Sequence, residues 1–188
     1  MSIKDDLRKW AKERRKSYSK DEVETLSLYI INRLLNLPIW EKTTYHVFLP
    51  IVKQNEVNTE GLLSILQGKD KRIVLPKAHL DGSLTHYLLE DQTKLVKNHW
   101  GILEPTSGLI IEANHIDVVF VPLLVGDLNG GRVGYGKGYY DRFLADCRPD
   151  VITIGLSLIE PVETIDDLEP HDHPLHWLIT PTADFQFN

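Results

Sequence analysis

The sequence has little of what secreted or membrane-spanning proteins carry. Cys147 is the only cysteine among 188 residues, so the chain can form no internal disulfide and no zinc site built from several cysteines. No stretch approaches the ~18 consecutive apolar residues of a membrane span. The first ten residues, MSIKDDLRKW, lack the apolar core of a signal peptide, and no Asn-x-Ser/Thr acceptor occurs. We therefore expect a cytoplasmic protein without a membrane partner.

The composition is typical of a folded domain. Hydrophobic residues make up 42% of the chain and charged residues 26%, which is enough for a sizeable core. The sequence contains no repeat, low-complexity tract or linker. We expect a single domain over residues 1–188, monomeric, in which N-terminal helices over 2–37 pack on an α/β body.

Charge is unevenly distributed along the chain. Residues 1–20 carry eight basic and three acidic side chains, net +5. The other 168 residues carry 13 basic and 24 acidic side chains, net −11. An acidic body argues against a nucleic-acid partner, whereas the basic head indicates that an anion is met locally.

Hydrophobic periodicity predicts helices separated by short apolar strands. Helices are expected over 2–16 (capped by Ser2), 20–37, 59–67 and 139–147, and strands over 44–49, 72–75, 116–125, 151–156 and 177–179. Segments 84–88 and 94–96 are expected to form a hairpin pair or edge strands. Several strands are apolar on both faces, so the pattern predicts an α/β fold, a three-layer sandwich with a mainly parallel central sheet.

The most informative segment is the glycine-rich stretch 127–141, DLNGGRVGYGKGYYD, between a predicted strand and a predicted helix. Gly134, Gly136 and Gly138 alternate with larger residues, so successive backbone N–H groups can converge without a Cβ in the way. The positive end of the following helix and the cations Arg132 and Lys137 add to this attraction. The stretch therefore predicts a polyphosphate site, with a tight turn of no function as the alternative.

The spacing of this stretch matches neither common phosphate loop. Gly131-x4-Gly136-Lys137 fits most of a Walker A pattern, but Gly138 stands where Ser or Thr must hold magnesium. The dinucleotide spacing GxGxxG is missed by one residue. Asp141, one turn into the helix, can supply the hard oxygen ligand that Mg²⁺ needs.

With these residues the chain resembles the 5-formyltetrahydrofolate cyclo-ligase (5,10-methenyltetrahydrofolate synthetase) family. Five matches occur in family order: Lys4 with Arg8, Phe48-Leu49 followed by Glu56, Leu75-Pro76-Lys77, Gly101–Pro105, and Arg132–Asp141. None is specific alone, but the five together cover nearly the whole chain. The resemblance implies a fold like that of ribose-5-phosphate isomerases and CoA transferases. It also implies an ATP- and Mg²⁺-dependent ring-forming ligase of one-carbon metabolism, which releases ADP and phosphate.

The implied chemistry needs no nucleophilic side chain. Phosphorylation of the formyl oxygen of 5-formyltetrahydrofolate gives an iminium phosphate, which N10 attacks before phosphate departs. The enzyme must hold the γ-phosphoryl group in line with that oxygen and neutralise spreading charge.

The resemblance implies a role for each matched residue. For ATP it implies Lys4, Arg8, Arg132, Val133, Gly134, Tyr135, Gly136, Lys137, Gly138, Tyr139 and Tyr140, with Lys137 and Arg132 as the catalytic cations. For the folate it implies Leu49, Glu56, Trp100, Tyr135 and Tyr139. Glu56 would accept from the N–H edge of the pterin, and Asp141 would hold Mg²⁺. One of Tyr139 and Tyr140 is expected in the core and the other toward ligand.

One position departs from the family pattern. His176 stands where the family has a second acid on the magnesium side, and imidazole is a poor Mg²⁺ ligand. Asp172 is an alternative ligand, and residues 171–176 could instead form a transition-metal cluster.

Two further alternatives concern function: a nucleotide-binding module without ligase activity, and a sugar-phosphate isomerase, for which no clear acid–base pair is evident.

Overall fold

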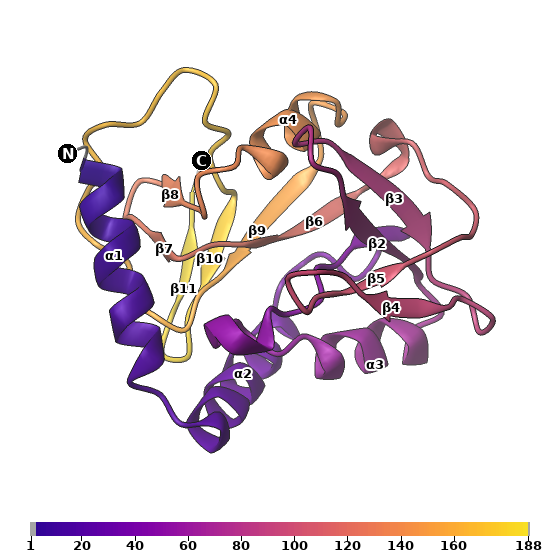
Figure 1. The fold of residues 1–188 in the computed structure, drawn as a ribbon, viewed down its shortest axis with the longest axis horizontal. Coiled ribbons are helices and arrows are strands. Elements are labelled where there is room, and N and C mark those ends of the chain that lie inside the picture. Colours follow the sequence, from indigo (N-terminus) through magenta and orange to yellow (C-terminus); the bar gives the residue numbers. More distant parts are fainter. Residues whose placement is uncertain (1–2, 188) are drawn as a thin grey trace.

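The centre of the molecule is a seven-stranded sheet, seen in a computed structural model that describes residues 3–187 (Figure 1). The strand order is β11-β10-β9-β6-β1-β2-β3. The bounds are Thr44–His46 (β1), Arg72–Ala78 (β2), Leu84–Leu88 (β3), Val118–Pro122 (β6), Ile152–Leu156 (β9), Trp177–Ile179 (β10) and Asp184–Gln186 (β11). Strands β10 to β2 in this order run parallel, and antiparallel β11 and β3 form the two edges. The predicted α/β fold with a mainly parallel sheet is confirmed.

Helices cover both faces of this sheet (Figure 1). The α-helices of the described chain are α1 (Ile3–Lys16), α2 (Lys20–Leu34), α3 (Glu60–Gly68) and α4 (Tyr139–Ala145). Leu34 of α2 and Leu62 of α3 share a core with Phe120 of β6, whereas Phe143 of α4 packs on the other face with Val119. Successive residues of β6 thus point to opposite cores, as the period of two in a strand requires.

The first helix packs on a small hairpin at the side of the sheet. Strands β7 (Val125–Gly126) and β8 (Arg132–Val133) pair antiparallel, and Ala11 of α1 is buried against Val125 and Val133. A second hairpin joins β4 (Leu95–Lys97) to β5 (Leu103–Pro105). Single 3₁₀ turns lie at Val52–Gln54 and Ala113–His115. Within the described residues no helix is long and apolar enough to cross a membrane.

The structure corrects several predicted boundaries and one predicted pairing. Residues 84–88 pair with β2 and residues 95–97 with β5, so the predicted hairpin between them is wrong. Strand β2 runs through Pro76, because β1 pairs with β2 only as far as Val74 and a missing N–H beyond that point breaks no bond to β1. Helix α2 ends at Leu34, before the predicted 37. The cap expected at Ser2 lies outside the described residues.

Candidate functional site

A cleft of about 480 Å³ brings together segments from the whole length of the chain. It lies between α1, the segment that follows β1, the β4–β5 hairpin and the loop from β8 to α4. The sequence-predicted site residues on this cleft are Lys4, Arg8, Leu49, Glu56, Trp100, Arg132, Val133, Gly134, Tyr135, Gly136, Lys137, Gly138, Tyr139, Tyr140, Asp141 and Asp172. His176 is absent from the described lining. Short motifs far apart in sequence therefore meet at one place.

The glycine-rich loop is anchored at its base by the carboxylate of Asp127. This buried side chain accepts backbone N–H bonds from Asn129 and Gly131 at 2.9 and 2.7 Å, and from Ile165 at 3.0 Å. Three charge-assisted bonds to backbone hold the turn before β8 in one conformation. The glycine-rich loop thus begins from a fixed point.

Two glycines of the loop have backbone angles that favour glycine. Gly136 has φ +87° and Gly138, the residue before α4, has φ +67°. A side chain at either position would be strained, and a Cβ at Gly136 would come within 3.3 Å of the Arg8 guanidinium. The loop therefore passes close to α1 because it carries no side chain there.

Helix α1 contributes three cations to the cleft lining, Lys12 and the pair Lys4 and Arg8, which lie one turn apart. Arg8 Nε donates to the carbonyl of Gly134 at 3.1 Å, which ties the helix to the glycine-rich loop. Lys4 Nζ lies 2.5 Å from Asp172 Oδ2. The (i, i+4) spacing places both side chains on one face of the helix. Positive charge at this end of the cleft comes from α1 as well as from the loop.

Arg132 is buried beside the carboxylate of Asp141. Its Nη2 donates to Asp141 Oδ1 at 2.6 Å, and its Nη1 donates to the carbonyl of His173. Burial lowers the pKa of the Arg132 guanidinium, and the charges of Asp141 and Asp172 oppose that effect. Arg132 thus links the start of α4 to the 167–173 segment.

Asp141 and Asp172 fit a divalent cation of the magnesium type. Both carboxylates act on the same guanidinium, that of Arg132, and both line the cleft. Among the described residues, Asp141 Oδ2 and Asp172 Oδ1 carry no hydrogen bond, so each side chain keeps one hard oxygen. Although burial opposes it, the bonds from Glu169 N–H and Lys4 hold the pKa of Asp172 below its usual value.

His176 does not belong to this group. Its Nδ1 lies 3.1 Å from the backbone nitrogen and 2.7 Å from Oγ1 of Thr153, at the start of β9. The side chain is used to join β9 and β10. Within residues 3–187 no three His, Cys, Asp or Glu side chains gather as a metal site, so the transition-metal cluster considered for 171–176 does not form.

The two adjacent tyrosines of α4 differ in how their hydroxyl groups are used. The Tyr139 hydroxyl donates to the carbonyl of His79 at 2.7 Å, which fixes this ring to the β2–β3 turn. The Tyr140 ring packs beside His46 and Phe143, and its buried hydroxyl has no partner among the described residues. Of these two adjacent hydroxyl groups, only that of Tyr140 has no bond within the described residues.

Glu56 is a buried carboxylate at the cleft wall. Its Oε2 accepts the Ile51 backbone N–H at 2.6 Å, and only 4% of the residue is exposed. Burial raises the pKa of Glu56, whereas the Arg15 charge, the Ile51 bond and a hydrogen bond from the Tyr135 hydroxyl lower it. Arg15, itself 2% exposed, was not among the sequence predictions. The one feature of the sequence that could have identified Arg15 is its position on the inner side of the predicted first helix.

The cleft lining also includes apolar side chains and a second glutamate. Leu49, Trp100 and Leu103 line it, and Trp100 lies on the turn of the β4–β5 hairpin. Glu104 is 8% exposed and accepts the Ala78 N–H at 3.1 Å. Glu104 lies within the Gly101–Pro105 match, but the family resemblance implies no role for it.

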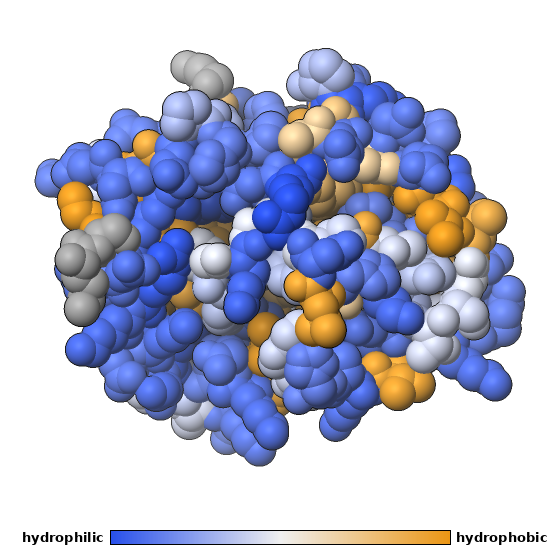
Figure 2. All heavy atoms as spheres, turned by 45° about the horizontal axis from the view of Figure 1, so that its top comes forward, coloured by the Kyte–Doolittle hydropathy of each residue, from blue (hydrophilic) through white to orange (hydrophobic). Residues whose placement is uncertain are grey.

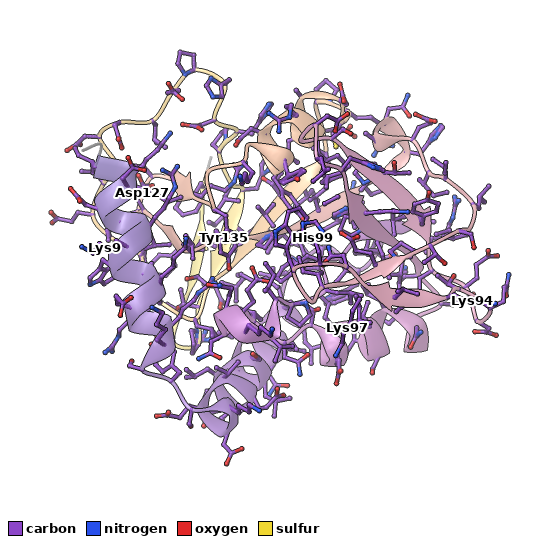
Figure 3. All side chains as sticks on the ribbon, viewed as in Figure 1. Lys9, Lys94, Lys97, His99, Asp127 and Tyr135 are labelled. Carbon is purple, nitrogen blue, oxygen red and sulfur yellow. The ribbon has the colours of Figure 1, made fainter. Side chains whose placement is uncertain are left out.

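The surface around these elements is mostly hydrophilic. Figure 2 shows hydrophobic side chains scattered over this face, with no broad apolar patch among them. Figure 3 places Tyr135 between α1 and the body of the protein, while Lys9 projects from the outer side of α1. Tyr135 thus lies on the inner side of the first helix and Lys9 on its outer side.

Comparisons with known proteins agree on one family. The model of the 5-formyltetrahydrofolate cyclo-ligase family matches residues 1–181. The 5-formyltetrahydrofolate cyclo-ligase of Escherichia coli K12 is 27% identical over 91% of this chain and 96% of its own length. That of Haemophilus influenzae is 30% identical over 68% and 71%. The solved structure of Aquifex aeolicus 5,10-methenyltetrahydrofolate synthetase aligns with TM-score 0.83 and 27% identity, over 99% of this chain and 93% of that one.

Proposed function

This chain belongs to the 5-formyltetrahydrofolate cyclo-ligase family, and we propose that it uses ATP and Mg²⁺ to convert 5-formyltetrahydrofolate to 5,10-methenyltetrahydrofolate. One observation supports this most strongly. The glycine-rich loop, Lys4 and Arg8 of α1 and the buried Glu56 face one cleft, whose lining also includes the apolar side chains of Leu49, Trp100 and Leu103. A polyphosphate and a flat heterocycle are the ligands that such a pair of surfaces suits.

ATP would bind along the loop and α1. Backbone N–H groups from Gly134 to Gly138 would cradle the phosphates, with Lys4 and Arg8 as counter-charges. Lys137 is exposed at the cleft and its side chain has no bond within the described residues, so it is available for the γ-phosphoryl group. Arg132 fixes the loop by donating to Asp141 and to the carbonyl of His173. It also lines the cleft, and we propose that its charge acts on the phosphates there.

Magnesium would be held by Asp141 and Asp172 through the oxygens that carry no hydrogen bond. When bound, the ion would neutralise phosphate charge that grows as the γ-phosphoryl group is transferred. Lys4 pairs with Asp172 in the structure. It would move part of this contact to the triphosphate when ATP binds.

The folate would occupy the Glu56 side of the cleft. An ionised Glu56 can accept two parallel N–H bonds from a pterin edge, and Leu49 and Trp100 offer apolar walls for the ring. Tyr135 lies beside Glu56, and the free hydroxyl of Tyr140 lines the same cleft. The formyl group would then meet the γ-phosphoryl group between the two halves of the site.

The reaction balances without a covalent enzyme intermediate. The formyl oxygen attacks the γ-phosphorus and ADP leaves, which gives a phosphorylated iminium carbon. N10 attacks that carbon, its proton is lost to solvent, and inorganic phosphate departs with the former formyl oxygen. The protein supplies alignment and charge stabilisation, which are the main contributions in phosphoryl transfer.

A direct test mixes the purified protein with ATP, Mg²⁺ and 5-formyltetrahydrofolate and follows the near-ultraviolet absorbance of the methenyl product. We expect product only when all three are present, with one ADP per turnover. ATP binding by folded protein without any product would refute the ligase and favour a nucleotide-binding module. The monomeric state, the cytoplasmic location and the kinship with ribose-5-phosphate isomerases and CoA transferases stay predictions.

A further inference from the structure

Arg15 lies inside the molecule, unlike most basic residues of α1. The side chain is 2% exposed, whereas the neighbouring Arg14 is exposed beside the Tyr18 ring. Arg15 Nη1 donates to the Tyr135 hydroxyl at 2.9 Å, and Nη2 donates to the Leu123 carbonyl. A buried guanidinium is costly unless its charge is balanced, so its surroundings need an explanation.

Glu56 is the carboxylate that balances it. The Tyr135 hydroxyl accepts from Arg15, and both Tyr135 and Arg15 lower the pKa of Glu56, so the three side chains form a relay from α1 to the cleft wall. The Ile51 N–H fixes Glu56 Oε2 from another direction. Asn55, next to Glu56 in the chain, donates from Nδ2 to the Arg15 carbonyl at 2.8 Å. Side chain and backbone of Arg15 therefore both meet the segment that carries Glu56.

We propose that Arg15 is a positioning residue: through Tyr135 it holds the buried Glu56 carboxylate in place and balances its charge, and so governs how tightly the folate binds. The proposal deepens the proposed function and rests on Glu56 as the pterin acceptor. Arg15 itself does not line the cleft, so its effect on the folate is transmitted and not direct.

The charged and titratable groups around Glu56 decide the expected pH dependence. Arg15 faces it from α1, Tyr135 from the loop before α4, and Tyr140 from α4 itself. Burial raises the pKa of both phenols, so they remain neutral donors near pH 7. Arg15 is thus the cation that opposes the rise in the pKa of Glu56 caused by burial.

The first experiment compares steady-state kinetics of wild type, Arg15→Gln and the matched control Arg14→Gln between pH 6 and 9. At pH 7 we expect Arg15→Gln to raise KM for 5-formyltetrahydrofolate about tenfold, because loss of the Arg15 charge raises the pKa of Glu56 further, with KM for ATP changed less than about twofold. The increase should shrink as pH rises, because higher pH favours the ionised form of Glu56 even without the Arg15 charge. Arg14→Gln should behave as wild type.

A Glu56→Gln background separates positioning from general structural damage. There, Arg15→Gln should cause no further rise in KM for the folate, and the pH dependence should be flat. An equal rise in that background, an equal rise at every pH, or an equal rise in KM for ATP would overturn the proposal. If Arg15→Gln does not fold, Tyr135→Phe interrupts the same relay and should give a smaller, pH-dependent increase of about threefold.

A second readout does not need catalysis. Glu56 has a raised pKa when folded, so its contribution to stability is full below its unfolded pKa and is lost as pH rises through the folded value. Arg15→Gln should enlarge that loss, so its melting temperature should fall more steeply from pH 5 to 8 than that of wild type, and Glu56→Gln should cancel the difference. Cancellation in an inactive protein would refute the proposed function and keep the Arg15–Glu56 coupling; additive effects would refute the coupling.

Discussion

Lys137→Ala tests whether the glycine-rich loop takes part in catalysis or is only a structural turn. Lys137 is exposed, and within the described residues its side chain makes no hydrogen bond or ion pair. Surface substitutions of this kind change the free energy of unfolding by less than about 0.5 kcal/mol, so the melting temperature should move by about 2 °C at most. Loss of one donor that stabilises transition-state charge costs about 3 kcal/mol. Turnover should therefore fall roughly a hundredfold.

The assay is product absorbance at saturating ATP and folate, with a melting curve on the same preparation. Lys9→Ala is the matched control, because Lys9 is an exposed lysine of α1 that projects away from the cleft (Figure 3). We expect the control to match wild type in both measurements. Turnover of Lys137→Ala within about threefold of wild type, or a loss of stability as large as its loss of activity, would refute the reasoning.

Three further predictions follow from the same geometry. Asp141→Asn should raise the Mg²⁺ concentration needed for half-maximal turnover about tenfold, and an unchanged Mg²⁺ titration would remove Asp141 from the metal site. Gly138→Ala should cost about 1 kcal/mol of stability because of the positive φ and should raise KM for ATP, whereas Gly68→Ala, which has open space and no positive φ, should be neutral in melting and ATP titrations. Burial lowers the pKa of His86 to about 4, so about 3 kcal/mol of stability should be lost as pH falls from about 6.5 to 4. Urea unfolding of His86→Leu should show a shallower pH dependence, and equal slopes would contradict the assignment.

Local sequence patterns predicted where the helices and strands lie better than they predicted which of these elements pair with each other. Apolar period and caps located all α-helices of the described chain within about three residues, because these signals are contained in the segment itself. The partner of residues 84–88 depended on long-range contacts, and so did the passage of β2 through Pro76. Strand β11 carries no strong apolar alternation and was missed, since its pairing with β10 fixes it.

For the site, residue chemistry was predictable and geometry was not. The alternation of glycines marked the loop, and a positive φ at Gly136 and Gly138 gives the physical reason. The sequence could not say which tyrosine hydroxyl is occupied, because the acceptor for Tyr139 is a carbonyl 60 residues away in the chain. Arg15 was missed for a related reason: Arg14 and Arg15 are consecutive residues of one helix, the first exposed and the second buried, and only packing distinguishes them.

The central claim is that the formyl oxygen is phosphorylated and leaves as phosphate. It can be tested with 5-formyltetrahydrofolate labelled with ¹⁸O in the formyl group, incubated with the enzyme, ATP and Mg²⁺ in unlabelled water. We expect one ¹⁸O atom in each inorganic phosphate released, in step with methenyl product. Label recovered in water, with unlabelled phosphate, would show that ATP is hydrolysed separately from ring closure and would contradict the account.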